Sequence, residues 1–307
     1  MEGIRFADVL QSFEKKTEDG EYVSVERDYN ERKVIENDVK RTELLGVDKR
    51  NQEAIKILKR LLFVELDKIP VKYTQGMSEV ASVFVLYYFQ EIVEEEVAKG
   101  MFIAEREEKP EGEASTAEGF SEHFIELPEE ETTELKKFLS RHKDIIAKLG
   151  VVLTNVFKRK LEPLVANDFK LYKENMKIFV EMMKKRGVKI PELESYKFMG
   201  SILTFFLRNL TKMEDVHKVF EIILSCPNTC PFLLLVLFYG QISSGKAIES
   251  INNKLFPKVV KLEEEFIETR KRIESKEVCP SKRKIMLIGG VISIITAVVV
   301  YKITRKE

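Results

Sequence analysis

Ser78–Ile92, which reads SEVASVFVLYYFQEI, decides the fold class of this chain. Its apolar side chains recur at intervals of three and four residues, at Val80, Val83, Phe84, Tyr87, Tyr88 and Ile92. A helix with 3.6 residues per turn gathers such a series on one face. The stretch therefore predicts a helix.

Helical spacing continues on both sides of this stretch. Asp48 is placed to cap a preceding helix, which carries Ile55, Leu58, Leu61 and Leu62 and stops near Pro70. Further helices are expected within 134–185, and one helix each at 191–206, 211–223 and 247–275. Phe232–Tyr239 is apolar throughout and suits a buried strand or a central helix, and its helical surroundings favour the helix. We therefore predict an all-α body.

The chain also contains an uncharged run near its C-terminus. Ile285–Tyr301 reads IMLIGGVISIITAVVVY, and basic residues flank it on both sides, at Lys282, Arg283, Lys284, Lys302, Arg305 and Lys306. A helix of about 17 residues is about 26 Å long, at the short end of what crosses a bilayer. This length fits a thin membrane such as the endoplasmic reticulum, at about 27 Å. The run predicts a single transmembrane helix over 285–303.

The N-terminal residues Met1–Asp8 lack the apolar core of a signal peptide. The body is therefore expected in the cytosol, with insertion by the tail. The predicted organisation is an N-terminal segment 1–21, a helical domain 22–275, a basic linker 276–284, the tail anchor 285–303 and a short tail 304–307. An acidic insertion with several Pro and Gly residues is expected within the domain at about 94–133.

The composition narrows the class of function. Lys+Arg and Asp+Glu balance at 51 each, which argues against a nucleic-acid binder, because such proteins carry a basic face. Three cysteines form no disulfide framework, and with three scattered histidines they predict no metal site.

Gly240–Ala247 is close to a phosphate-binding loop, but Ala247 lacks the hydroxyl that holds Mg²⁺. A helix-terminating turn is the preferred interpretation of that stretch.

Two short segments carry candidate chemistry. In Ile35–Thr42, Asp38 and Arg41 are three residues apart and share one helix face. In Tyr73–Met77, Gln75 and Gly76 fall in a loop between two helices. Hydrolysis of GTP needs positive charge on the transferring phosphoryl group and an amide that orients water, and an Arg and a Gln supply these. By themselves the residues also fit a surface ion pair and an ordinary loop.

The two segments resemble the TBC family of Rab GTPase-activating proteins. The family pattern I-x-x-D-x-x-R is matched by Ile35, Asp38 and Arg41, and Y-x-Q-G by Tyr73, Gln75 and Gly76. Phe198–Gly240 resembles the C-terminal helices of the same domain, so the resemblance spans roughly Tyr22 to Ile273. With its hydrophobic tail, the chain looks most like the branch of this family that is anchored at the endoplasmic reticulum.

The resemblance implies a two-finger mechanism. Arg41 would neutralise charge on the γ-phosphoryl of a bound Rab, and Gln75 would orient the attacking water. Asp38 and Tyr73 would position these two side chains, with Gly76, Ile35 and Thr42 in support. The chain would then be no self-contained enzyme and would hold no cofactor of its own, because the Rab carries GTP and Mg²⁺.

The expected partners are therefore a Rab of early secretory traffic and, through 285–303, a lipid bilayer. Two other functions stay open from the sequence. One is a non-catalytic scaffold or trafficking adaptor that binds a Rab at the membrane. The other is a tail-anchored structural protein without a GTPase partner.

Overall fold

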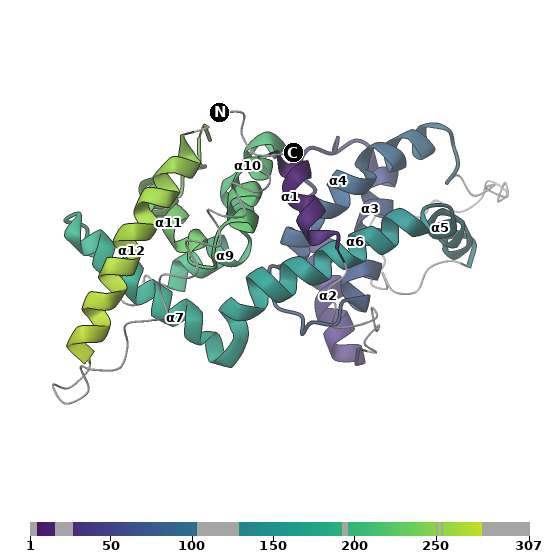
Figure 1. The fold of residues 1–307 in the computed structure, drawn as a ribbon. Coiled ribbons are helices and arrows are strands. Elements are labelled where there is room, and N and C mark those ends of the chain that lie inside the picture. The colour runs from purple at the N-terminus through teal and green to yellow at the C-terminus, as the bar shows by residue number, and fades with distance from the viewer. Residues whose placement is uncertain are drawn as a thin grey trace, which may run out of the picture.

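The structure is a computed structural model that describes residues 5–15, 27–102, 129–191, 196–249, 251–252 and 254–277. Every regular element in these ranges is helical, so the all-α prediction is confirmed (Figure 1). The α-helices are α1 (Phe6–Phe13), α2 (Tyr29–Arg41), α3 (Gln52–Lys68), α4 (Met77–Ala98), α5 (Glu129–Arg141), α6 (Lys143–Val156), α7 (Glu162–Lys185), α9 (Met199–Leu203), α10 (Met213–Ser225), α11 (Cys230–Ser243) and α12 (Leu255–Glu277). Short π and 3₁₀ turns occupy η1 (Phe157–Leu161), η2 (Tyr196–Phe198) and η3 (Leu207–Asn209).

Helix α4 is the centre of the N-terminal half. It packs along α3 over most of its length and also contacts α2 and α6. Seven residues in a row from Val80 to Leu86 are buried, so the helix is enclosed on all sides rather than on one face. The helix expected at Ser78–Ile92 is therefore confirmed, and it is a central helix of this half.

Helix α11 has the same role in the C-terminal half. It packs against α7 and α12, and Phe232, Leu233, Leu234 and Leu235 are completely buried. The helical interpretation of Phe232–Tyr239 is thus confirmed. Helix α1 lies between the halves, where it contacts α6 and α10 (Figure 1).

Several predicted helix boundaries differ from the structure. Asn51, not Asp48, caps α3, because its side chain accepts a hydrogen bond from the Ala54 N–H at 3.2 Å. The helical region expected over 134–185 consists of α5, α6, η1 and α7, and α7 breaks where residues 167–169 adopt left-handed backbone angles. The helical spacing of apolar residues does not reveal these breaks, because that spacing continues across them.

The prediction of a helical domain followed by a transmembrane helix needs correction. Among the helices that the structure describes, none is both long and apolar enough to cross a bilayer. The predicted anchor at 285–303, the short tail at 304–307 and most of the basic linker fall outside the described ranges. What the structure supports is the helical body alone.

The predicted acidic insertion at 94–133 begins and ends in helices. Helix α4 continues to Ala98, and α5 begins at Glu129. Residues 103–128, which make up most of that prediction, fall outside the described ranges.

Candidate functional site

Arg41 is the last residue of α2, and its side chain reaches into solvent. It is 69% exposed, and one guanidinium nitrogen, Nη2, donates to Oδ1 of Asp38. Its Nε also donates to the carbonyl of Asn37, at 3.2 Å. Arg41 is therefore oriented by its own helix but is not enclosed by other parts of the protein.

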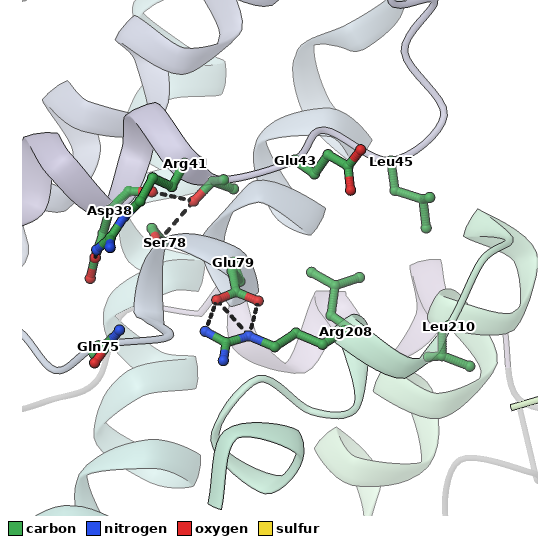
Figure 2. Close-up of a pocket in the computed structure, with 11 residues that line it drawn as sticks. Asp38, Arg41, Glu43, Leu45, Gln75, Ser78, Glu79, Arg208 and Leu210 are labelled. Atoms are coloured by element: carbon green, nitrogen blue, oxygen red, sulfur yellow. Dashed lines mark hydrogen bonds and ion pairs between the residues drawn. The ribbon is translucent and has the colours of Figure 1, made fainter. Parts of the chain in front are cut away.

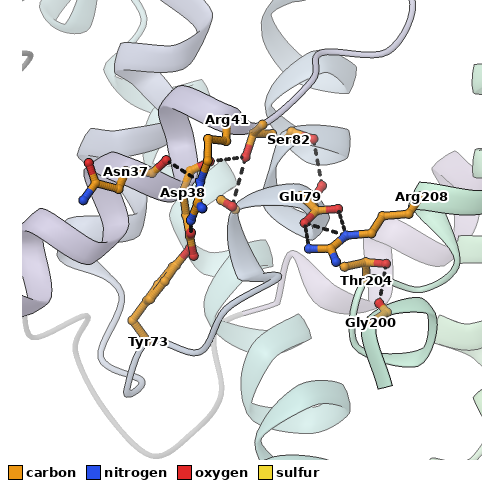
Figure 3. A network of polar contacts seen from close by, with 11 residues as sticks. Asn37, Asp38, Arg41, Tyr73, Glu79, Ser82, Gly200, Thr204 and Arg208 are labelled. Atoms are coloured by element: carbon orange, nitrogen blue, oxygen red, sulfur yellow. Dashed lines mark hydrogen bonds and ion pairs between the residues drawn. The ribbon is translucent and has the colours of Figure 1, made fainter. Parts of the chain in front are cut away.

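Asp38 connects Arg41 to the interior. Only 8% of the Asp38 side chain is exposed, and its second oxygen accepts a hydrogen bond from the Tyr73 hydroxyl at 2.9 Å (Figure 3). Burial raises the pKa of Tyr73, so the hydroxyl keeps the proton that it donates to Asp38. Thr42 supports the same turn, donating to the Asp38 carbonyl at 2.8 Å, and lies 3.0 Å from the Ser78 hydroxyl. The predicted contact between Asp38 and Arg41 is thus observed, with Tyr73 as an added partner.

Gly76 shapes the loop that carries Gln75. It is the N-cap residue of α4 and has a φ of +101°, a backbone conformation that residues with a Cβ rarely adopt. A Cβ at this position would also lie 3.2 Å from Cγ2 of Thr204. Both constraints explain why glycine stands here, and the turn leaves Gln75 exposed directly before the helix.

Arg27 and Glu31 hold the chain that leads to this loop. The guanidinium of Arg27 is nearly buried and donates to the carbonyls of Ile69 and Val71, at 2.7 and 2.8 Å. Glu31 accepts from the backbone N–H of Tyr73 at 3.1 Å and forms an ion pair with Arg27. These two residues were not predicted, since nothing local links them to a loop some forty positions away.

The two predicted finger residues line one cavity of about 400 Å³. Figure 2 shows Arg41, Asp38 and Gln75 at one end, with Ser78 and Glu79 between them and the opposite wall. The complete lining consists of Asp38, Arg41, Thr42, Glu43, Leu45, Gln75, Ser78, Glu79, Leu207, Arg208 and Leu210. Ile35 is completely buried and is not among the residues that line the cavity. The fold thus brings together two exposed side chains from separate elements, as the resemblance implies.

A second arginine enters the cavity from the C-terminal half. Arg208 on η3 forms an ion pair with Glu79, which lies in the first turn of α4 (Figure 3). Its Nε lies 2.8 and 3.0 Å from the two carboxylate oxygens, and Nη2 also donates to Glu79. This bonding raises the pKa of Arg208. Sequence inspection missed the pair, because 129 positions separate its members.

Comparison with known proteins gives one informative match. The chain is 77% identical over 308 aligned residues to an uncharacterized membrane protein of Encephalitozoon cuniculi (strain GB-M1), and the alignment covers 100% of both chains. The chain belongs to the family of that membrane protein. No model of a known protein family matches the chain. No solved structure matches it either.

Membership in this family leaves the TBC resemblance a prediction, because the relative's name states only that it is a membrane protein.

Two other sequence interpretations can be compared with the structure. At Gly240–Ala247, α11 ends at Ser243 and Gly245 has a φ of +69°, so the helix-terminating turn is confirmed. Cys226 and Cys230 are free thiols. No group of three or more His, Cys, Asp or Glu side chains in the described ranges could hold a metal ion.

Proposed function

We propose that this protein is a GTPase-activating protein for a Rab-type small GTPase of early secretory traffic. The observation that carries the proposal is the joint exposure of Arg41 and Gln75 on one cavity. One comes from the end of α2 and the other from the loop before α4, 34 positions apart. A GTPase docked over this cavity would receive a guanidinium and a carboxamide at the same place.

Arg41 supplies the positive charge in this mechanism. Charge spreads over the γ-phosphoryl oxygens in the transition state, and an arginine supplied in trans accelerates hydrolysis by about 10³–10⁵. The planar guanidinium can bridge two phosphate oxygens, which an ammonium cannot do. Asp38 and the Asn37 carbonyl hold Arg41 against its own helix before the GTPase arrives, and the largely exposed guanidinium can leave these contacts at small cost.

Gln75 positions the attacking water. Its carboxamide both donates and accepts hydrogen bonds, so it can hold a water molecule in line with the phosphoryl group. The backbone constraint at Gly76 limits how the loop can move, which fixes the direction from which Gln75 approaches. Tyr73 and Asp38 tie the same loop to α2.

Single-turnover hydrolysis tests this mechanism directly. The protein, purified in detergent, is mixed with each GTP-loaded Rab of the organism that encodes it, and phosphate release is followed. The stimulated rate constant for the cognate Rab should fall about 10³-fold in Arg41→Ala. A loss of about 10²-fold is expected in Gln75→Ala.

Two exposed residues outside the cavity provide matched controls. Arg50 pairs with Asp48, and Gln52 donates to the Lys49 carbonyl. Arg50→Ala and Gln52→Ala should match the wild type. Equal rates for wild type, Arg41→Ala and Gln75→Ala would refute the finger mechanism. Tight GTP-dependent binding of a Rab without faster hydrolysis would instead favour the scaffold function.

We also propose that the protein acts at an endomembrane. The full-length relative is named a membrane protein, which supports membrane association of this chain. The endoplasmic reticulum is the first candidate, because the anchored branch of the resembled family lies there, with the body in the cytosol. Immunofluorescence against a marker of that compartment tests the assignment, and a mitochondrial or plasma-membrane pattern would overturn it.

A further inference from the structure

The turn between α9 and η3 is held in an unfavourable backbone conformation. Phe205 and Phe206 have φ values of 50° and 64°, in the left-handed region that non-glycine residues rarely occupy. Such residues are strained and persist only where the surroundings fix them. Both rings are completely buried, Phe205 against Phe220 and Phe206 against Phe238. The C-terminal core therefore anchors this turn firmly.

The anchored turn contacts the Gln75 loop at two points. Thr204, just before the two phenylalanines, lies next to Gly76. A Cβ added at Gly76 would lie 3.2 Å from the methyl group of Thr204. Arg208, just after them, binds both carboxylate oxygens of Glu79. Glu79 lies three positions after Gly76 in the first turn of α4. The turn thus contacts the chain immediately after Gln75 both at the cap and in the first helical turn.

Gly200 allows Arg208 to take this position. A Cβ at Gly200 would lie 3.2 Å from Nη1 of Arg208, so another residue there would require the guanidinium to move by a few tenths of an ångström. Its Nε and Nη2 are occupied by Glu79. Two nitrogens of Arg208 are therefore bonded to one carboxylate, whereas Arg41 meets Asp38 through one nitrogen.

We propose that Arg208 is a positioning residue for Gln75. Through Glu79 it fixes the start of α4 against the anchored turn, and this sets the place from which the Gln75 carboxamide meets the attacking water. The inference rests on the proposed function for its effect on hydrolysis, while its effect on the loop is measurable without any GTPase. Arg208 does not touch the phosphoryl group in this scheme.

A structural experiment tests the loop effect first. Hydrogen–deuterium exchange is measured on the full-length protein in detergent, for peptides that cover 73–80. We expect Arg208→Ala to speed amide exchange there about tenfold. Arg186→Ala is the matched control, because Arg186 and Glu265 form another long-range bidentate pair, at 2.9 and 2.6 Å, between the end of α7 and α12. That control should leave exchange at 73–80 unchanged.

A mutant cycle tests the effect on hydrolysis. If Arg208 acts by placing Gln75, its loss should matter only while Gln75 is present. We expect Arg208→Ala to lower the stimulated rate constant about tenfold in the wild type but less than twofold in Gln75→Ala. In Arg41→Ala the tenfold cost should persist. The swap Arg208→Glu with Glu79→Arg should restore part of the rate lost in either single variant.

The outcomes separate this inference from the proposed function. Failure of the wild type to stimulate any Rab would refute the proposed function. The exchange result would then be the test of whether Arg208 fixes the Gln75 loop. Stimulation by the wild type, with an equal Arg208→Ala cost in the presence and absence of Gln75, would refute the positioning role. Unchanged exchange at 73–80 in Arg208→Ala would refute it as well.

Discussion

Two arginines reach the same cavity and are held in opposite ways. Arg41 is 69% exposed and pairs through one nitrogen with a carboxylate of its own helix, three positions away. Arg208 is 48% exposed and binds both oxygens of a carboxylate from the other half of the protein. The first pair constrains only a side chain, whereas the second connects two parts of the fold.

This difference indicates a division of roles. A guanidinium that must enter a partner's site has to leave its resting contact at small cost, and this is easier for a largely exposed guanidinium that meets its carboxylate through one nitrogen. A guanidinium that fixes a loop needs two bonds and a rigid base, which the buried Phe205 and Phe206 provide. Three further predictions follow the comparison from the strongest effect to the weakest.

Replacing Arg41 by lysine should have the largest effect. Lysine keeps the charge but loses the planar fork that bridges two phosphate oxygens. We expect Arg41→Lys to lower the stimulated rate constant by about 10²-fold or more, with the melting temperature unchanged. Single-turnover hydrolysis and thermal unfolding measure the two quantities. Full activity in Arg41→Lys would mean that charge alone matters, and the finger would not act by bidentate contact.

Removing the charge of Asp38 should have an intermediate effect. Asp38→Asn keeps the shape and still accepts from Tyr73, but it no longer holds the Arg41 guanidinium by charge. We expect about a tenfold loss in the stimulated rate constant, because Arg41 becomes less well oriented. Tyr73→Phe is the comparison variant, since it leaves the Arg41 contact intact. A larger loss in Tyr73→Phe than in Asp38→Asn would contradict the assigned order of importance.

The smallest effect concerns stability and separates the two pairs most simply. Loss of Arg41 should change the free energy of unfolding by about 0.5 kcal/mol or less, because the buried Asp38 keeps its hydrogen bond from Tyr73 and the lost pair joins residues of one helix. Loss of Arg208 should cost about 1 kcal/mol, because it leaves Glu79, which is 19% exposed, without its partner. Urea unfolding of the two alanine variants, followed by circular dichroism, measures the difference. Equal values would remove the structural distinction between the two arginines.

Much of the fold was predictable from periodicity. Apolar residues recur at helical intervals around Leu58, Phe84 and Phe220, and each of these residues lies buried in a helix. Boundaries were less predictable, because a cap depends on which of several polar residues meets a free N–H group. Asn51 rather than Asp48 does so for α3. The left-handed backbone at 205–206 carries no glycine signal, because packing of the buried Phe205 and Phe206 fixes it.

For the candidate site, the sequence by itself determined which residues to examine. Short-range spacing puts Asp38 and Arg41 on one helix face, and Gly76 marks the turn that exposes Gln75. Only the tertiary structure decided that these residues line a common cavity, and that Arg27, Glu79 and Arg208 support it. The physical reason is the separation in sequence between the residues that interact. A helical turn relates residues three or four positions apart, whereas contacts across 34 to 129 positions depend on how the buried faces of all the helices pack.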